Sequence, residues 1–492
     1  MGTKAQEGEN DVARWNARKI IVAAHEMAPE HRLKPTLSWP HLIALGVGAI
    51  VGTGILTLTG VGAAKAGPAV ILSFAIAGLI CAAAALAYAE MATMIPASGS
   101  AYTYTYVVLG ELIAWIVGWS LILEYSLVVS AVAVGWSGYA SPLLIQWLHF
   151  PEWLTHAPAF EGTLREGTLH MTALGLNTPA ILIIAIVAGL LIAGTRESAT
   201  INAALVLVKV IALVVFVAVT LPYFDSAHFH PFMPYGFPKS GPPGSEVGVM
   251  AAAAIIFFAF YGFDAIATAA EETKNPGRDL SIGIVGSMVA CVIIYMAVAG
   301  AAIGALAYSQ FANSPEPLAL ILREIGQPLA AQYLALSAVI ALPTVILAFF
   351  YGQSRIFFVM ARDGLLPQRL ARVSPRGAPV RITIFTAIVV AVLGGLIPLA
   401  DLAALANAGT LTAFIAVSVC MLVMRRRAPD VPRLFRMPMA WPIGIFGILG
   451  CLYLLYSLPQ RTQIWFACAQ VVGLALYFAY GARRSVAGRA DV

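Results

Sequence analysis

Long apolar stretches dominate the chain and limit what it can fold into. Twelve segments of about 20 residues carry hardly any charge, and this is the length at which a helix crosses the hydrocarbon core of a bilayer. Of the 492 residues, 60% are hydrophobic and only 11% are charged, whereas a soluble chain carries about a quarter of its residues charged. The sequence therefore predicts an all-α polytopic membrane protein without a large soluble domain.

The predicted spans form two series of five, followed by two more. They cover residues 41–63, 69–94, 106–134, 176–194, 200–222, 248–271, 282–307, 331–360, 380–398, 402–424, 440–458 and 463–481.

The basic residues predict the orientation of these spans. Residues 1–35 are polar and mixed in charge, unlike a cleavable signal peptide, so we expect the N-terminus to stay in the cytoplasm. Alternate loops are then cytoplasmic, and these loops hold most of the 29 Lys and Arg, as the positive-inside rule requires. Twelve spans return the C-terminus to the same side. The basic residues left outside are Lys65, Arg165, Lys239, Arg323 and Arg461.

The first span has glycines crowded at its centre, at Gly46, Gly48, Gly52 and Gly54. Each glycine costs roughly 1 kcal/mol of helix propensity relative to alanine, so a cluster favours unwinding of the backbone. Unwound backbone inside a membrane is tolerated only beside a protected cavity. Close helix packing through small residues is the alternative explanation.

The sixth span is interrupted by Gly262 and Asp264. An ionisable side chain at that depth is a functional candidate by default. Capping of the exposed backbone of a broken helix is the structural alternative for Asp264.

The positions of the two breaks predict an internal repeat. Each series of five spans begins with an interrupted helix, and because five is odd, the second series enters the membrane from the opposite side. Two antiparallel halves meeting around a site at the bilayer midplane are therefore expected.

Four longer motifs make the chain similar to a known family. GAIVGTGI (48–55), AYAEMATMIPASGSAY (87–102), GFDAIATAAEETKNPGRDL (262–280) and YGQSRIFFVMARDGLLP (351–367) resemble amino acid–polyamine–organocation transporters, and most of all the bacterial cationic amino acid transporter subgroup. The similarity extends over about residues 35–480.

The resemblance implies a LeuT-like fold, a five-plus-five inverted repeat with broken helices one and six. It divides the chain into a cytoplasmic segment (1–35), a ten-helix transport core (36–430), two peripheral helices (431–481) and a cytoplasmic tail (482–492). The core holds repeat one at about 41–222 and repeat two at about 248–424. The expected function is secondary active, proton-coupled import of an L-amino acid across the cytoplasmic membrane.

The family pattern also implies which groups bind an amino acid. Backbone N–H groups at Ile50, Thr53 and Gly54, with the Thr53 hydroxyl, would meet the carboxylate. Carbonyls at Phe258, Ala259 and Tyr261 would receive the ammonium. Both ends of a broken helix favour such contacts through their dipoles, and the residues expected to support the breaks are Gly48, Gly52, Gly262 and Asp264.

Two deep ionisable residues are candidates for proton coupling. Lys209 lies in NAALVLVKVIALVVF, at mid-depth in the fifth span, where burial opposes its charge. The family places a lysine here in the position of a bound sodium ion, while permanent pairing with a carboxylate is the alternative. Glu124 in the third span either holds a proton or bonds to the unwound backbone.

Near the cytoplasmic ends, charged residues either form a gate of salt bridges or only mark the topology. They are Glu90, Glu271, Glu272, Lys274 and Arg278.

Other classes of function fit less well. A channel needs a continuous polar lining, and an enzyme needs converging catalytic groups; the spans predict neither. No cofactor, metal or nucleic-acid partner is expected, and the five cysteines are interpreted as packing residues. A non-transporting amino-acid sensor would share the binding site. Whether the substrate is neutral or cationic stays open, with Ala348 and Phe349 in the eighth span as candidate determinants of pocket depth.

Overall fold

The computed structural model describes Arg18 and residues 37–95, 99–161, 170–193, 199–260, 262–268, 273–312, 314–367 and 380–485. Within them, eight helices are long and apolar enough to cross a membrane. They contain, in order, α4 (Val70–Met94), α6 (Glu111–Leu148), α8 (Ala199–Thr220), α11 (Pro276–Ala305), α14 (Pro328–Arg362), α16 (Leu399–Arg427), α17 (Ala440–Ser457) and α18 (Gln460–Leu476).

Four further apolar helices are shorter. They are α1 (Trp39–Ile50), α7 (Thr178–Ala193), α9 (Val249–Ile256), which continues into the 3₁₀ turn η9 (Phe257–Ala259), and α15 (Val380–Leu396). Every predicted apolar segment thus coincides with a helix or with a broken helix in the described part of the chain, which confirms a membrane protein with helical spans.

Short elements connect the long helices. They are α2 (Thr53–Leu56), α3 (Leu58–Ala66), η4 (Gly67–Ala69), α5 (Ser100–Val108), η5 (Glu152–Leu154), η7 (Leu221–Tyr223), η8 (Ser226–Phe229), α10 (Asp264–Thr268), α12 (Tyr308–Phe311), α13 (Pro317–Glu324), the π-helix η11 (Tyr477–Gly481) and α19 (Ala482–Arg484). Strands β1 (Ala159–Glu161) and β2 (His170–Ala173) pair antiparallel.

The third predicted span begins at the wrong residue. We predicted a span from 106, but α5 ends at Val108 and α6 begins at Glu111. Gly110 between them has φ +101°, a backbone conformation that only glycine adopts without strain, so the chain turns there. Apolar composition could not reveal this turn, because tyrosines and valines continue up to it.

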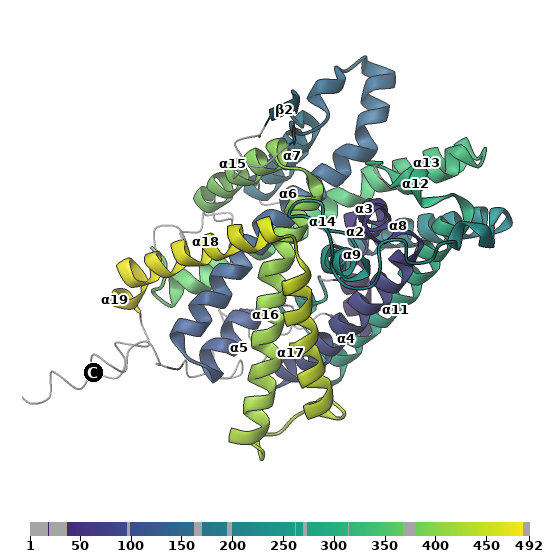
Figure 1. The fold of residues 1–492 in the computed structure, drawn as a ribbon. Coiled ribbons are helices and arrows are strands. Elements are labelled where there is room, and N and C mark those ends of the chain that lie inside the picture. The colour runs from purple at the N-terminus through teal and green to yellow at the C-terminus, as the bar shows by residue number, and fades with distance from the viewer. Residues whose placement is uncertain are drawn as a thin grey trace, which may run out of the picture.

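The helix α6 is the centre of the packing. It contacts α14, α16, α15 and α7, while α4 packs on α11. Two indole N–H groups of α6 bind α18: Trp115 donates to the carbonyl of Gly473 (2.9 Å) and Trp119 to that of Ala469 (2.8 Å). In Figure 1 α16 and α17 run side by side, and the short α2 and α9 lie near the middle of the bundle.

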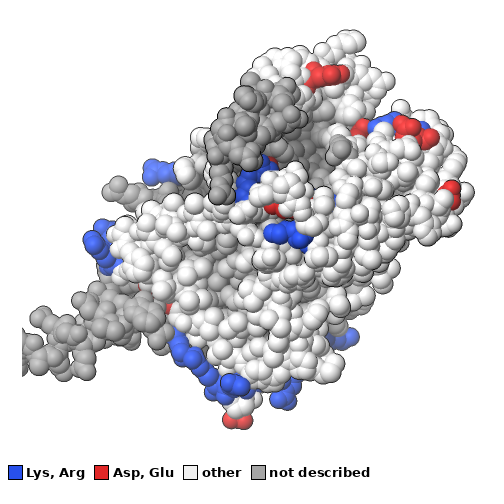
Figure 2. Space-filling view, viewed as in Figure 1, with Lys and Arg blue, Asp and Glu red and all other residues white. Residues whose placement is uncertain are grey.

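Charged side chains are placed mainly at the ends of the bundle. Figure 2 shows a broad uncharged region over the lower half of the visible face, between a group of charged side chains near the middle of the view and Lys and Arg at the lower edge, where α16 and α17 end in Figure 1. An uncharged belt between charged ends is what a multi-pass membrane protein requires.

Glu90 organises one of these charged ends. Its carboxylate on α4 accepts two bonds from Arg425 of α16 (2.7 and 2.6 Å), one from Arg433 (3.1 Å) and one from the Met437 N–H (2.9 Å). Glu90 is fully buried and both arginines are largely so. This network joins α4 to α16 and to the segment leading into α17, and neither arginine was among the predicted gate residues.

Replacing Glu90 with alanine is expected to lower the free energy of unfolding by about 3–5 kcal/mol, because two buried guanidinium groups lose their counter-charge. The matched control is Asp401→Ala, which breaks the exposed Asp401–Arg461 pair (2.8 Å); such pairs contribute about 0–1 kcal/mol. Melting temperatures in detergent measure both. Equal melting temperatures for the two variants would contradict a stabilising role for the Glu90 network.

Candidate functional site

The first span is broken at its glycine cluster. The helix α1 ends at Ile50, Val51 and Gly52 are not helical, and α2 starts at Thr53. The last carbonyls of α1 and the first N–H groups of α2 therefore lack the partners that a continuous helix would supply. The unwinding that the glycine cluster predicts is confirmed at Gly52.

Two side chains from distant helices bind the freed carbonyls of α1. The Nζ of Lys209 in α8 donates to the carbonyl of Gly48 at 2.7 Å. The hydroxyl of Tyr295 in α11 donates to the carbonyl of Ile50 at 2.8 Å. Lys209 is 3% exposed, so its ammonium is held deep in the bundle against the end of the broken helix.

The sixth span is broken in a similar way. After α9 the chain tightens into η9, Gly262 adopts φ +115°, and α10 begins at Asp264. The amide nitrogen of Asn407 in α16 donates to the carbonyls of Ala254 (2.7 Å) and Ile255 (2.9 Å). These bonds satisfy carbonyls of the last turn of α9.

The two breaks touch each other at two points. A Cβ atom on Gly54 would lie 2.3 Å from the Cα of Ala259, and one on Gly262 would lie 3.0 Å from the carbonyl carbon of Ala49. The end of α1 therefore meets Gly262 in the break of the sixth span, and the end of η9 meets Gly54 just after the break of the first span. Glycine at both positions permits this approach of backbone to backbone.

The two predicted carboxylates lie beside the breaks. Asp264 is the first residue of α10, where a helix dipole favours negative charge, and its Oδ2 accepts a bond from the Tyr125 hydroxyl (3.0 Å). Glu124, on the neighbouring position of α6, is buried and lies next to Thr410 of α16. Neither carboxylate lines the cavity described next.

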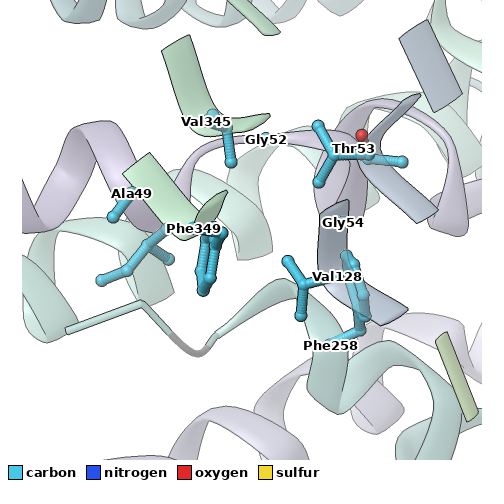
Figure 3. A pocket seen from close by; sticks show the side chains of 10 residues that line it. Ala49, Gly52, Thr53, Gly54, Val128, Phe258, Val345 and Phe349 are labelled. Atoms are coloured by element: carbon cyan, nitrogen blue, oxygen red, sulfur yellow. The ribbon is translucent and has the colours of Figure 1, made fainter. Parts of the chain in front are cut away.

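A small cavity lies between the breaks. Its volume is about 10 Å³, which is room for about one water molecule. In Figure 3 Phe349 stands between Ala49 on one side and Val128 and Phe258 on the other. The lining residues are Ala49, Ile50, Gly52, Thr53, Gly54, Val128, Val132, Phe258, Val345 and Phe349.

The structure brings together most of the predicted site residues. Ile50, Thr53, Gly54 and Phe258 line the cavity, as does Gly52, and Ala259 lies directly behind Gly54. Tyr261 lies outside the described residues.

Sequence reasoning missed the side chains that hold the breaks open. Tyr295 and Asn407 lie in predominantly apolar stretches of α11 and α16, and a polar residue in such a stretch is the signal that marks them. The cavity walls formed by Val128, Val132 and Val345 were not predicted either, because valine is equally common on a lipid-facing surface. In the described part of the chain no group of three or more His, Cys, Asp or Glu side chains is placed to hold a metal ion.

Comparisons with known proteins establish the family. A family model described as amino acid permease matches residues 37–474. This chain is an amino acid permease family member. The resemblance to amino acid–polyamine–organocation transporters is thereby confirmed.

Several named relatives align with most of this chain. It is 43% identical to the branched-chain amino acid permease BcaP of Bacillus subtilis over 480 residues, covering 97% of this chain and 99% of that protein. It is 40% identical to the methylthioribose transporter of the same organism, covering 95% and 98%. It is also 38% identical to the vacuolar cationic amino acid transporter 4 of Arabidopsis thaliana, covering 84% and 67%.

Proposed function

We propose that this permease imports neutral L-amino acids with branched apolar side chains, by proton-coupled alternating access. The observation that carries the proposal is the cavity between the two broken helices, which combines backbone groups at its ends with apolar walls. A zwitterion needs hydrogen-bond donors for its carboxylate and acceptors for its ammonium, and two helix breaks side by side offer both.

The two ends of the substrate are assigned to the two breaks. The first N–H groups of α2, from Thr53 and Gly54 onward, would bind the carboxylate, since no preceding helical turn accepts a hydrogen bond from them. The carbonyls at the end of η9, including those of Phe258 and Ala259, would receive the ammonium. The Thr53 side chain lines the cavity and adds a hydroxyl donor.

The walls of the cavity favour a neutral substrate. Its side-chain surface comes from Val128, Val132, Val345, Phe258 and Phe349, which suit a branched aliphatic group. A cationic side chain would need a carboxylate at the cavity, whereas Tyr125 binds Asp264 and Glu124 lies toward Thr410. The name of the Bacillus subtilis relative at 43% identity agrees with this choice.

The cavity is too small for an amino acid as it stands, which supports alternating access. A volume that admits about one water requires the walls to separate before leucine can enter. Each break can serve as a hinge, because the two halves of each broken helix pack against different partners. The helix α1 contacts α10, and α3 contacts α9. We assign twelve crossings, both termini in the cytoplasm and a five-plus-five inverted repeat to this arrangement.

Lys209 is proposed to couple transport to protons. Its ammonium binds the carbonyl of Gly48 at the end of α1, so losing a proton removes the positive charge that strengthens this bond and loosens the hold on that half-helix. Glu124 is a second proton-binding candidate, since its buried carboxylate lies beside the break in the sixth span.

Proteoliposome uptake tests the proposed function. With an imposed inward proton gradient, uptake of L-leucine is expected to exceed that of L-arginine roughly 100-fold, because a charged side chain without a partner in a membrane costs about 2.5–3.5 kcal/mol. Adding sodium should change neither rate. Arginine uptake equal to leucine uptake would contradict the neutral assignment, and leucine binding without uptake would identify a sensor instead of a carrier.

A further inference from the structure

We infer that Tyr125 is a positioning residue that links the wall of the substrate pocket to the break in the sixth span, and that it thereby sets which side-chain size the pocket accepts. This inference rests on the proposed function. It adds a residue that does not line the cavity but contacts one that does.

Tyr125 holds the ring of Phe349. The two rings lie edge to face, with centroids 5.4 Å apart and planes at 61°, a favourable aromatic geometry. Phe349 is 3% exposed and lines the cavity. The position of this bulky wall residue therefore depends on where the Tyr125 ring lies.

A slot in α14 receives the Tyr125 ring. A Cβ atom on Gly352 would lie 2.6 Å from the Cε1 of Tyr125, so glycine at this position makes room for the ring. Gly352 follows Phe349 by three residues on the same helix, and such residues lie on one face. Tyr125 therefore packs against one face of α14, over Phe349 and Gly352 together.

The hydroxyl of Tyr125 reaches the other break. It donates to Oδ2 of Asp264 at 3.0 Å, and Asp264 is the first residue of α10. One side chain of α6 thus joins the half-helix after Gly262 to the pocket wall on α14.

This connection makes the pocket wall respond to the position of α10. A displacement of α10 stretches or breaks the hydrogen bond from the Tyr125 hydroxyl. The Tyr125 ring then shifts, and Phe349 turns away from the cavity. While the bond is intact, Phe349 is held inward and large side chains are excluded. Loss of the bond is expected to admit larger substrates.

The test is Tyr125→Phe, which keeps the ring and removes the hydroxyl. In proteoliposomes the ratio of L-phenylalanine to L-leucine uptake, each as Vmax/KM, is expected to rise about tenfold. Asp264→Ala should give the same rise, and adding Tyr125→Phe to it should change nothing more. Asp264→Asn retains an acceptor oxygen, so its ratio should stay near that of the wild type.

Tyr104→Phe is the matched control. Its hydroxyl is buried and has no hydrogen-bond partner in the described part of the chain, so the ratio should not change. Wild-type leucine uptake with an unchanged ratio in both Tyr125→Phe and Asp264→Ala would overturn this inference alone. Absence of leucine uptake by the wild type would overturn the proposed function and this inference with it. If Tyr125→Phe fails to fold, Asp264→Ala reports on the same bond.

Discussion

Replacing Lys209 with methionine is expected to abolish accumulation of leucine driven by a proton gradient. Methionine keeps most of the side-chain volume but cannot bind a proton or donate to the Gly48 carbonyl, which Lys209 contacts at 2.7 Å. One charge crossing 100 mV supplies about 2.3 kcal/mol, a concentration ratio of about fifty. The inside-to-outside leucine ratio in proteoliposomes should therefore fall from tens to about one.

Counterflow separates coupling from binding in this variant. Exchange of external labelled leucine for internal leucine requires the substrate site but no proton movement, so Lys209→Met should retain it. Lys209→Arg is the charge-preserving comparison: arginine keeps its proton under all conditions and should also lose accumulation. Accumulation by Lys209→Met at the wild-type level would contradict the assignment of Lys209 to proton coupling.

Among variants that leave every charged side chain in place, Gly54→Ala is expected to lower the rate of leucine transport most. The added methyl group would lie 2.3 Å from the Cα of Ala259, and backbone cannot turn aside as a flexible side chain can. Overpacking costs about 1–3 kcal/mol, and here the two breaks must separate to accept the methyl group. Initial rates of leucine uptake are expected to fall about 100-fold, equivalent to about 2.7 kcal/mol.

Gly300→Ala provides the control for Gly54→Ala. A Cβ atom on Gly300 of α11 would meet no atom within 4 Å, and alanine favours a helix over glycine by about 1 kcal/mol. This variant should transport leucine at the wild-type rate. Uptake by Gly54→Ala within twofold of the wild type would contradict the close crossing of the two breaks.

The helical segments and both breaks could be predicted from the sequence because their signals are local. Apolar length predicts a helix, and glycines at Gly52 and Gly262 predict where it ends. The depth of Lys209 was also predictable, since apolar residues surround it on both sides. Each of these properties depends on residues within one segment.

The partners of the breaks could not be predicted because they lie far away in the sequence. Tyr295 binds a carbonyl 245 residues earlier, and Asn407 binds one 153 residues earlier. Hydropathy is the same whichever face of α11 or α16 turns inward, so only packing decides these contacts. The role of Asp264 illustrates the same limit, since its partner Tyr125 stands on α6.

The start of α6 was misplaced for a different reason. Composition averages over a window, whereas one glycine with positive φ is enough to end α5 and start a new helix. The Glu90 network was missed because Arg425 and Arg433 look like ordinary residues of a cytoplasmic loop. Topology rules explain where such residues occur but not which carboxylate they bind.

The binding mode of L-leucine can be measured in a crystal structure of the permease with the substrate bound. We expect the substrate carboxylate to lie within about 3.2 Å of backbone N–H groups at Thr53 and Gly54, with the ammonium on carbonyls at the end of η9 and the side chain against Val128 and Phe349. Leucine bound elsewhere, or continuous helices in place of the two breaks, would contradict this expectation.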